Sequence, residues 1–319
     1  MTFSSLSKEK LKKVIEPHFH EALTASEYEV NNIDPKNLLT HTRFDLSFKL
    51  LFLKMSSVDI NLAKEAYEEH IKALTLGKFI EPGNSNKNSL NKYFKSFEDI
   101  HYDIKQNSFN VEKSVVPISS NGSIANGAHR VASSIVLNSK VPCVDLAVKD
   151  HIYDYKFFRA RNVSKELLDI AACEFIENAQ NVYLAIIWPS AIGKDAELES
   201  IIKNIVYRKE VKLNSNGAHN LLSQIYYGED WIGSFKDNYK GADGKLVECF
   251  KSFNEIRFVA FQSNNIDDVR KIKEKVRNIF HLGKHSIHIS DSHIETLRIS
   301  RLVFNENSIH FLNNAHPNR

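Results

Sequence analysis

Apolar positions recur at helical spacing through much of the first 75 residues. The pattern is clearest over residues 60–76, where apolar side chains return every three to five positions and the run stops at Gly77, a common helix terminator. Further helices are predicted at residues 7–25 and 46–55. Residues 1–75 are therefore expected to form a helical N-terminal segment.

Strand signals begin directly after this segment. Residues 78–81 predict a short strand that ends in a proline–glycine turn, and the asparagine–glycine pair at 121–122 is the usual signal of a tight hairpin. The other elements are predicted as a helix at 97–106, strands at 114–118 and 123–125, a helix at 129–138 and a strand at 141–147. This order predicts a second, mixed domain over residues 76–149.

From residue 150 onward, helical and strand patterns alternate. Helices are predicted at 165–179, 196–204, 219–226, 266–280 and 294–304, and strands at 182–188, 210–213, 256–262, 286–289 and 308–312. Strands that alternate with helices favour an α/β layer structure. The expected fold class is thus α+β or α/β, with a C-terminal α/β domain over residues 150–319.

The composition is that of an ordinary folded protein, and 319 residues are enough for two domains. The 42 basic and 39 acidic residues leave a formal charge of +3, too even a balance to mark a nucleic-acid-binding surface. Cys143, Cys173 and Cys249 are widely spaced, so neither a disulfide framework nor a zinc site is indicated. No run approaches the roughly 18 apolar residues of a membrane helix, and a cytoplasmic location is expected.

The candidate chemistry centres on Asn126-Gly127-Ala128-His129-Arg130, between a predicted strand and a predicted helix. The first turn of a helix has unsatisfied N–H groups and the positive end of the dipole, and a glycine lets the backbone approach a phosphate. Arg130 could hold phosphate oxygens bidentately, and His129 could add a donor. The alternative is a plain turn followed by a solvated arginine.

The order of elements over residues 78–144 resembles the ParB/sulfiredoxin family. The segment has a strand that ends at a proline turn, a helix, a "PI" strand, a hairpin, a motif similar to "DGxHR" and a closing "vPv" strand. The resemblance implies that the motif binds the phosphates of ATP, ADP or CTP, and that Glu81 acts on a substrate hydroxyl, as in the member that phosphorylates free serine. The nucleotide-binding residues implied are Asn126, Gly127, Ala128, His129 and Arg130, and the catalytic residues implied are Glu81 and His129.

Three features depart from the family pattern. Asn126 stands where aspartate is usual, which puts metal or hydroxyl contacts at this position in doubt. The arginine-rich box of chromosome-partition ParB proteins is absent from residues 81–93, which weighs against a DNA clamp. Ala128 stands where sulfiredoxins carry their redox cysteine, so peroxiredoxin repair is excluded.

Candidates for substrate binding lie in the tract 283–291. Because strand ends and the following helix start form a natural site in α/β layers, Lys284, His285 and Asp291 are expected to reach a phosphorylated substrate. His285 and His288 lie three apart on a predicted strand, hence on opposite faces, which is poor geometry for one metal ion. No residue is assigned to metal binding.

Three further features each keep two interpretations. Residues 231–245 fit either a substrate-closing loop or a plain surface loop. Arg43 fits either a phosphate contact or an ion pair with Asp45. The tetrapeptide at 126–129 recurs at 216–219, either as a true repeat or by chance.

These observations favour a phosphotransferase that moves phosphate from ATP or CTP, with Mg²⁺, to a small hydroxyl-bearing metabolite. Residues 76–149 would hold the nucleotide, residues 150–319 the acceptor, and Glu81 would accept the hydroxyl proton. The acceptor is expected to be sugar-like or amino-acid-like, with surface-polysaccharide synthesis as one setting. The alternatives are a nucleotide-sensing regulatory protein and a DNA-associated ParB-like protein. No membrane partner is expected, and the sequence does not indicate an oligomeric state.

Overall fold

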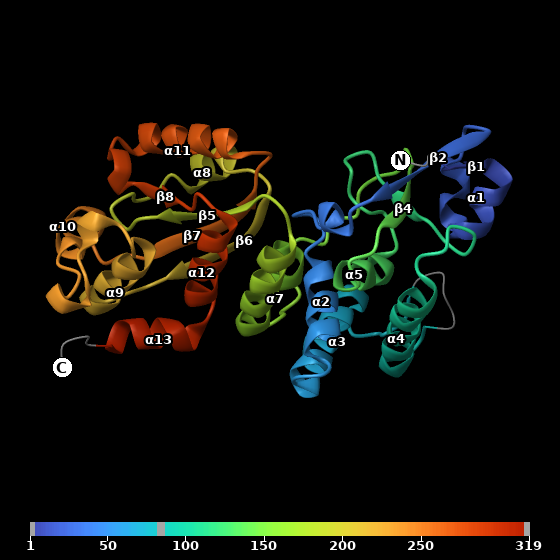
Figure 1. The fold of residues 1–319 in the computed structure, drawn as a ribbon, viewed down its shortest axis with the longest axis horizontal. Coiled ribbons are helices and arrows are strands. Elements are labelled where there is room, and N and C mark those ends of the chain that lie inside the picture. The colour runs from blue at the N-terminus through green and yellow to red at the C-terminus, as the bar shows by residue number, and fades with distance from the viewer. Residues whose placement is uncertain (1–3, 82–86, 316–319) are drawn as a thin grey trace. The chain divides into compact units, whose positions relative to one another are not determined.

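The computed structural model describes residues 4–81 and 87–315, and the chain divides into two compact units, Met1–Gln180 and Asn181–Arg319 (Figure 1). Both units combine helices with a small sheet, as the predicted α+β class requires. Among the described residues, no helix is both long enough and apolar enough to cross a membrane.

The sheet of the N-terminal unit has the strand order β1-β2-β4-β3. Its strands are β1 (Ser4–Ser7), β2 (Glu27–Ile33), β3 (Val116–Ile118) and β4 (Val141–Asp145). The β1–β2 and β2–β4 pairs are antiparallel, whereas β3 runs parallel to β4. Helix α5 (Ala128–Val136) makes the crossover that a parallel pair needs. The helical segment expected over residues 1–75 thus also contains the strands β1 and β2, which the sequence pattern did not predict.

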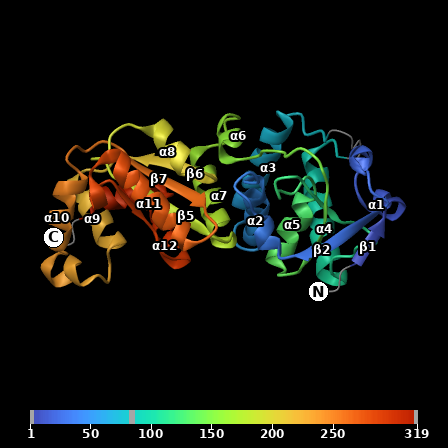
Figure 2. The same cartoon turned by 90° about the horizontal axis from the view of Figure 1, so that it is seen from above.

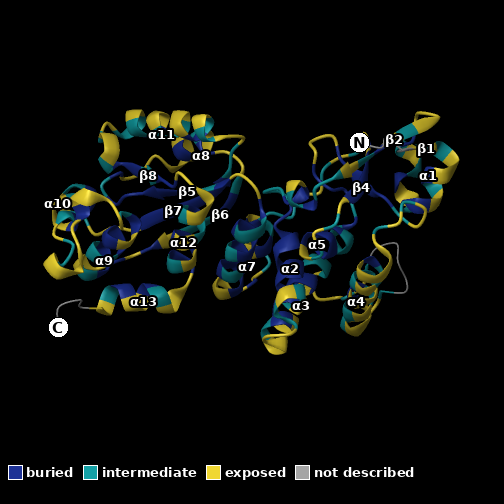
Figure 3. Cartoon of the chain, in the orientation of Figure 1, coloured by how far each residue is buried: buried dark blue, intermediate teal, exposed yellow. Residues whose placement is uncertain are grey.

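Helix α2 lies inside this unit, where its polar residues Asp45, Ser47 and Lys49 are buried together with its apolar ones. Residues Asp45–Phe52 of α2 are all buried, and Figure 3 shows the buried colour along most of its length. The helices are α1 (Lys8–Val14), α2 (Asp45–Met55), α3 (Ile60–Thr75), α4 (Leu90–Asn107), α5, α6 (Tyr155–Arg159) and α7 (Lys165–Asn178), with 3₁₀ turns η1 (Pro17–Ala22) and η2 (Pro35–Leu38). Helices α3, α5 and α7 all pack against α2. A helix with eight successive buried residues must be enclosed, and here the enclosure includes α7.

The boundary between the two compact units falls between Gln180 and Asn181, which differs from the predicted domain boundaries. The expected boundaries at 75/76 and 149/150 both lie inside the N-terminal unit. The physical reason is that α6 and α7 complete the aromatic core around α2, where Phe44 stacks on Phe175 and Phe48 packs on Phe158.

The C-terminal unit is built on a four-stranded sheet of order β6-β7-β5-β8 with only antiparallel pairs. Its elements are β5 (Val182–Ile187), α8 (Asp195–Ile201), β6 (Ile205–Val211), α9 (Ser215–Ile225), η3 (Asp230–Ile232), η4 (Phe235–Asp237), α10 (Gly241–Cys249), β7 (Ile256–Gln262), α11 (Ile266–Phe280), η5 (Gly283–His285), β8 (Ile287–Ile289), α12 (His293–Val303) and α13 (Glu306–Asn314). This strand order with two helical crossovers is the split βαβ arrangement, into which α9 and α10 are inserted between β6 and β7.

Helices cover both faces of this sheet. Helices α8 and α11 lie over one face, and α9, α12 and α13 lie over the other, as Figures 1 and 2 show. The apolar side chains between the sheet and the pair α8 and α11 form one continuous buried cluster, which includes Ile187, Leu198, Phe261 and Val276. The central strands β5 and β7 alternate their side chains between two covered faces and are almost wholly buried, whereas the edge strand β6 is only partly buried.

Several elements differ from the sequence prediction. The helix expected at 7–25 ends at Val14, and the strand expected at 123–125 forms only a bridge from Ile124 to Ile118. Residues 308–312 were expected to form a strand but lie in α13, because Asn305 caps the helix and Ile309 and Leu312 share its buried side. Residues 78–81 form no strand beyond a single bridge, since Phe79 has φ +52° and so leaves the extended region. The turn expected at 82–83 lies outside the described residues.

Candidate functional site

The predicted glycine turn and helix start are present at residues 126–130, but the strand predicted at 123–125 is reduced to a single bridge between Ile124 and Ile118. Gly127 caps α5 with φ +90°, a left-handed conformation that favours glycine. A Cβ atom added to Gly127 would lie 2.9 Å from Cγ2 of Val116, so a larger residue would also clash. Asn126 accepts a hydrogen bond from the Gly127 amide at its Oδ1, which fixes the turn. Position 127 therefore requires glycine for two reasons: the backbone has a positive φ, and a Cβ atom has no space.

The side chain of Arg130 already has protein partners. Its Nη2 donates to Oε1 of Glu16 at 3.1 Å, and its Nη1 donates to the carbonyl oxygen of Val115 at 3.4 Å. The guanidinium also packs beneath the turn, with Nη2 3.1 Å from the position of a Cβ on Gly127. A phosphate that used Arg130 as the predicted clamp would have to compete with Glu16.

His129 lies in the first turn of α5 beside an aromatic cluster. Its Nε2 is 2.7 Å from the hydroxyl of Tyr67, and its ring centroid is 4.5 Å from that of Phe97. Burial lowers the pKa of His129 well below its usual value, and the nearby charges of Lys49 and Lys87 lower it further. The imidazole is therefore neutral at pH 7, with one nitrogen able to donate and the other able to accept a hydrogen bond.

A buried charged cluster, formed by Arg43, Asp45, Lys49 and His70, lies in the same unit. Asp45 is 1% exposed and accepts from Arg43 Nε at 2.8 Å, from Arg43 Nη2 at 2.9 Å and from Lys49 Nζ at 2.9 Å. Arg43 also donates to the carbonyl oxygen of Ile124, just before the motif. Of the two interpretations of Arg43, the ion pair with Asp45 is the one observed.

The cluster carries two cations against one carboxylate. Although burial raises the pKa of Asp45, the charges of Arg43 and Lys49 outweigh it and hold this pKa well below its usual value. Burial and the charge of Lys49 lower the pKa of His70 well below its usual value, so His70 is neutral and its Nε2 lies 3.0 Å from Lys49 Nζ. Burial likewise lowers the pKa of Lys49. The interior next to α5 thus has a surplus of positive charge.

Glu81, the predicted proton acceptor, lies beside Lys87. Its Oε2 is 3.1 Å from Lys87 Nζ, and Lys87 lies 5.7 Å from the ring centroid of Tyr93. Burial raises the pKa of Tyr93 to about 12, and the charge of Glu81 adds to this rise. The charge of Glu81 also acts on Tyr67, whose hydroxyl contacts His129. The structure therefore brings Glu81 and His129 into one neighbourhood, connected through Tyr67.

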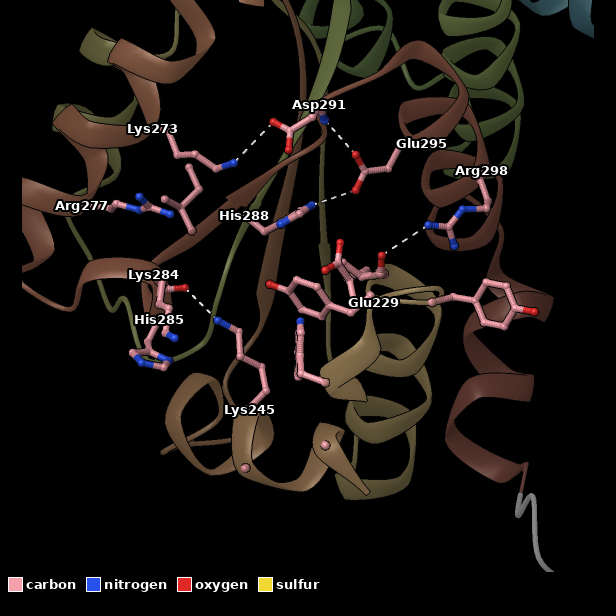
Figure 4. Close-up of a pocket in the computed structure, with 17 residues that line it drawn as sticks. Glu229, Lys245, Lys273, Arg277, Lys284, His285, His288, Asp291, Glu295 and Arg298 are labelled. Atoms are coloured by element: carbon pink, nitrogen blue, oxygen red, sulfur yellow. Dashed lines mark hydrogen bonds and ion pairs between the residues drawn. The ribbon is translucent and has the colours of Figure 1, made fainter. Parts of the chain in front are cut away.

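The C-terminal unit contains a cavity of about 890 Å³ (Figure 4). The three predicted substrate residues Lys284, His285 and Asp291 line it together. Further lining residues from the insertion, α11, β8 and α12 include Tyr226, Glu229, Trp231, Gly241, Gly244, Lys245, Lys273, Arg277, His288, Glu295 and Arg298. Residues 231–245, which fitted either a closing or a plain loop, thus form one wall of the cavity.

Polar contacts inside this cavity fix several of the side chains. His288 Nε2 lies 3.0 Å from Oε1 of Glu295, and the amide of Asp291 donates to Oε2 of Glu295 at 2.7 Å. Burial raises the pKa of Glu295, but the hydrogen bonds from His288 and the Asp291 amide outweigh this effect and lower it. Glu295 therefore stays ionised and orients His288 toward the cavity wall, where it packs edge-on against Tyr226.

The second copy of the tetrapeptide has a different structure. Residues 216–219 lie inside α9, whose N-cap is Asn214, whereas in the first copy the helix begins only after the glycine. A Cβ on Gly217 would lie 2.2 Å from Oδ1 of Asn313, so this glycine allows α9 and α13 to pack closely. The recurrence therefore does not form a structural repeat.

Sequence reasoning missed Lys49, His70 and Lys87 in the N-terminal unit and Lys273, Arg277 and Arg298 in the C-terminal cavity. Within the described residues, no group of three or more His, Cys, Asp and Glu side chains is placed to hold a metal ion. Comparison with known proteins gives no match, since no family model, no curated protein and no solved structure corresponds to this chain.

Proposed function

We propose that the protein is a nucleotide-dependent phosphotransferase whose N-terminal unit holds the phosphates of ATP or CTP at the start of α5. The observation that carries the proposal is the grouping of a glycine turn, a helix start, His129, Lys87 and Glu81 in one neighbourhood. The resemblance of residues 78–144 to the ParB/sulfiredoxin family supports the same assignment.

Phosphoryl transfer depends mainly on positioning and on neutralisation of charge. The first turn of α5 offers backbone N–H groups and the positive end of the helix dipole. Lys49 and Lys87 are close enough to lower the pKa of His129, so the same charges would attract phosphate oxygens. Mg²⁺ would neutralise the phosphates further, and Glu81 is a carboxylate of this group that could contact it.

Transfer forms a bond between the acceptor oxygen and the terminal phosphorus of the nucleotide. It breaks the bond between that phosphorus and the bridging oxygen, which leaves with the nucleoside diphosphate. The proton of the acceptor hydroxyl goes to Glu81, which must first leave Lys87. Neutral His129 can donate one hydrogen bond to a phosphate oxygen while Tyr67 holds its other nitrogen. The acceptor is a small hydroxyl-bearing metabolite, and surface-polysaccharide synthesis is one process that uses such acceptors.

The test incubates the full-length protein with ATP or CTP, Mg²⁺ and a pool of hydroxyl-bearing metabolites, followed by phosphorus NMR. A new phosphorylated species is expected. Glu81→Gln should lower turnover by about 10² to 10⁴-fold and leave nucleotide affinity nearly unchanged, because a general base acts mainly on rate. Glu68→Gln, an exposed position on α3, is the matched control and should behave as wild type.

Two outcomes would contradict this assignment. If Glu81→Gln leaves turnover within a few-fold of wild type, Glu81 is not the base. If nucleotide binds but no metabolite gains phosphate, the protein is better described as a nucleotide sensor. The ion pair between Glu81 and Lys87 favours this second function, because it occupies the carboxylate in the free protein.

A further inference from the structure

The cavity of the C-terminal unit has more positive than negative charge. Five of its lining residues are Lys or Arg, and three are Asp or Glu. The cations are Lys245, Lys273, Arg277, Lys284 and Arg298, and the carboxylates are Glu229, Asp291 and Glu295. They come from α10, α11, η5, α12 and the loops that carry Glu229 and Asp291, and they face one space (Figure 4). A concave site of one dominant sign concentrates ligands of the opposite sign.

Most of these cations are not neutralised by a carboxylate of the cavity. Lys273 pairs with Asp291 at 3.6 Å, and Arg277 pairs with Glu274 at 2.6 Å. In contrast, no carboxylate in the described part of the chain lies within ion-pair distance of Lys245, Lys284 or Arg298. Lys245 donates to the carbonyl oxygen of Lys284 at 3.0 Å, and Arg298 donates to that of Ile225 at 3.3 Å.

Two buried polar atoms of the lining also lack partners. Nε of Arg277 and Nδ1 of His285 are buried without a hydrogen bond to any described residue. Such atoms are rare in folded proteins, because an unmade hydrogen bond costs free energy.

One wall of the cavity is aromatic. Trp231 is 47% exposed, and its ring lies 4.9 Å from that of Tyr226. Tyr226 is held in turn by His288 and by the ammonium group of Lys245, 5.6 Å from its ring centroid. A flat, partly exposed ring beside polar groups suits a ligand that has both an apolar face and hydroxyls.

We infer that this cavity binds a phosphorylated sugar, with the phosphate on the cations and the sugar ring against Trp231. The carboxylates of Glu229 and Asp291 would accept hydrogen bonds from hydroxyls. The volume of about 890 Å³ is within the range of small-molecule sites, roughly 300 to 1,000 Å³. The inference goes beyond the proposed function, because it names a ligand for a cavity that lies outside the proposed nucleotide site.

The experiment is isothermal titration of the full-length protein, without nucleotide, at constant ionic strength. The probes are glucose 1-phosphate, glucose 6-phosphate, mannose 6-phosphate, fructose 6-phosphate, glucose and inorganic phosphate. At least one sugar phosphate should bind, and glucose should bind at least about tenfold more weakly, because it lacks the charge-assisted hydrogen bonds. Lys284→Ala should weaken that sugar phosphate about tenfold or more.

Matched variants separate the contributions. Lys271→Ala, 71% exposed on α11 and outside the cavity lining, should leave affinity unchanged. Trp231→Ala should weaken the sugar phosphate by about two- to tenfold and leave inorganic phosphate unaffected, since only the ring contact is lost. The side chains of Lys271 and Trp231 are both exposed enough to be removed without unfolding the unit.

Several results would overturn the inference. They are that no sugar phosphate binds, that inorganic phosphate binds as tightly as the best sugar phosphate, or that Lys284→Ala has no effect. ATP binding that Lys284→Ala weakens and Lys87→Ala does not would place the nucleotide in this cavity instead. Failure of the proposed function is seen separately, as sugar-phosphate binding without any transfer of phosphate from ATP or CTP.

Discussion

Replacing Asp45 by Asn tests the buried charged cluster most directly. Asp45 Oδ2 accepts hydrogen bonds from both Arg43 and Lys49, so an amide nitrogen at this position would face two donors. Removing one partner of a buried ion pair costs about 3 to 5 kcal/mol, because the remaining charges stay buried without compensation. For a unit of this size, 1 kcal/mol corresponds to about 2 to 4 °C in Tm, so a fall of about 6 to 20 °C is expected.

The assay is thermal unfolding followed by circular dichroism at pH 7, with Asp99→Asn as the control. Asp99 is also on a helix and paired with a lysine, but it is 66% exposed, so its substitution should cost less than about 1 kcal/mol. A fall in Tm of similar size for both variants would refute the reasoning. The transition of the C-terminal unit, if separate, should not move.

The same carboxylate gives a pH dependence of known sign. Because the folded-state pKa of Asp45 is depressed, its contribution to stability is present above the ordinary aspartate pKa and is lost as the pH falls toward the folded value. Wild-type protein should therefore lose stability below about pH 4, where unfolded aspartates take up protons. Urea unfolding at a series of pH values should show a shallower decline for Asp45→Asn. Equal slopes would contradict the assignment.

Two further pairs of variants test the motif and the cavity wall. Arg130→Ala should weaken nucleotide binding about tenfold or more if its guanidinium reaches phosphate. Glu16→Gln removes the ion-pair partner of Arg130 and should not weaken nucleotide binding. If both variants bind nucleotide with unchanged affinity, the role of Arg130 is structural only. In urea unfolding, Gly241→Ala should destabilise by about 1 to 3 kcal/mol, since its Cβ would lie 2.0 Å from the carbonyl oxygen of Trp231. Gly244→Ala, with nothing within 4 Å, should stabilise α10 by about 0.5 to 1 kcal/mol, and equal stabilities would contradict the close packing.

The motif at 126–130 could be predicted because its chemistry is local. A glycine with positive φ and a helix start depend on neighbouring residues, and the structure has both, whereas the strand predicted at 123–125 forms only a single bridge. The direction of Arg130 could not be predicted, because Glu16 comes from a segment 114 residues away. Local rules therefore gave the backbone of the candidate site and missed the partner of its most basic side chain.

The buried cluster was missed for a similar reason. Asp45 and Lys49 stand four residues apart, a spacing that is usual for an exposed ion pair on a helix surface. Only the packing of α3, α5 and α7 around α2 buries this pair. In the C-terminal unit, Lys284 and Asp291 could be found from their place near a strand end, whereas Lys245 reaches the cavity from α10, 39 residues before Lys284 in the sequence.

The charge balance next to α5 bears on why such a costly cluster exists. A buried ion cluster is usually no more stable than well-packed hydrocarbon of the same volume, so stability alone gives no reason for Arg43, Asp45 and Lys49. Asp45 compensates only one of the two cations, and the excess charge reaches His129 in the first turn of α5. An anion bound there would receive attraction from this excess, from the helix dipole and from Lys87 together. The phosphate ligand proposed above would supply the compensating charge that the described interior lacks.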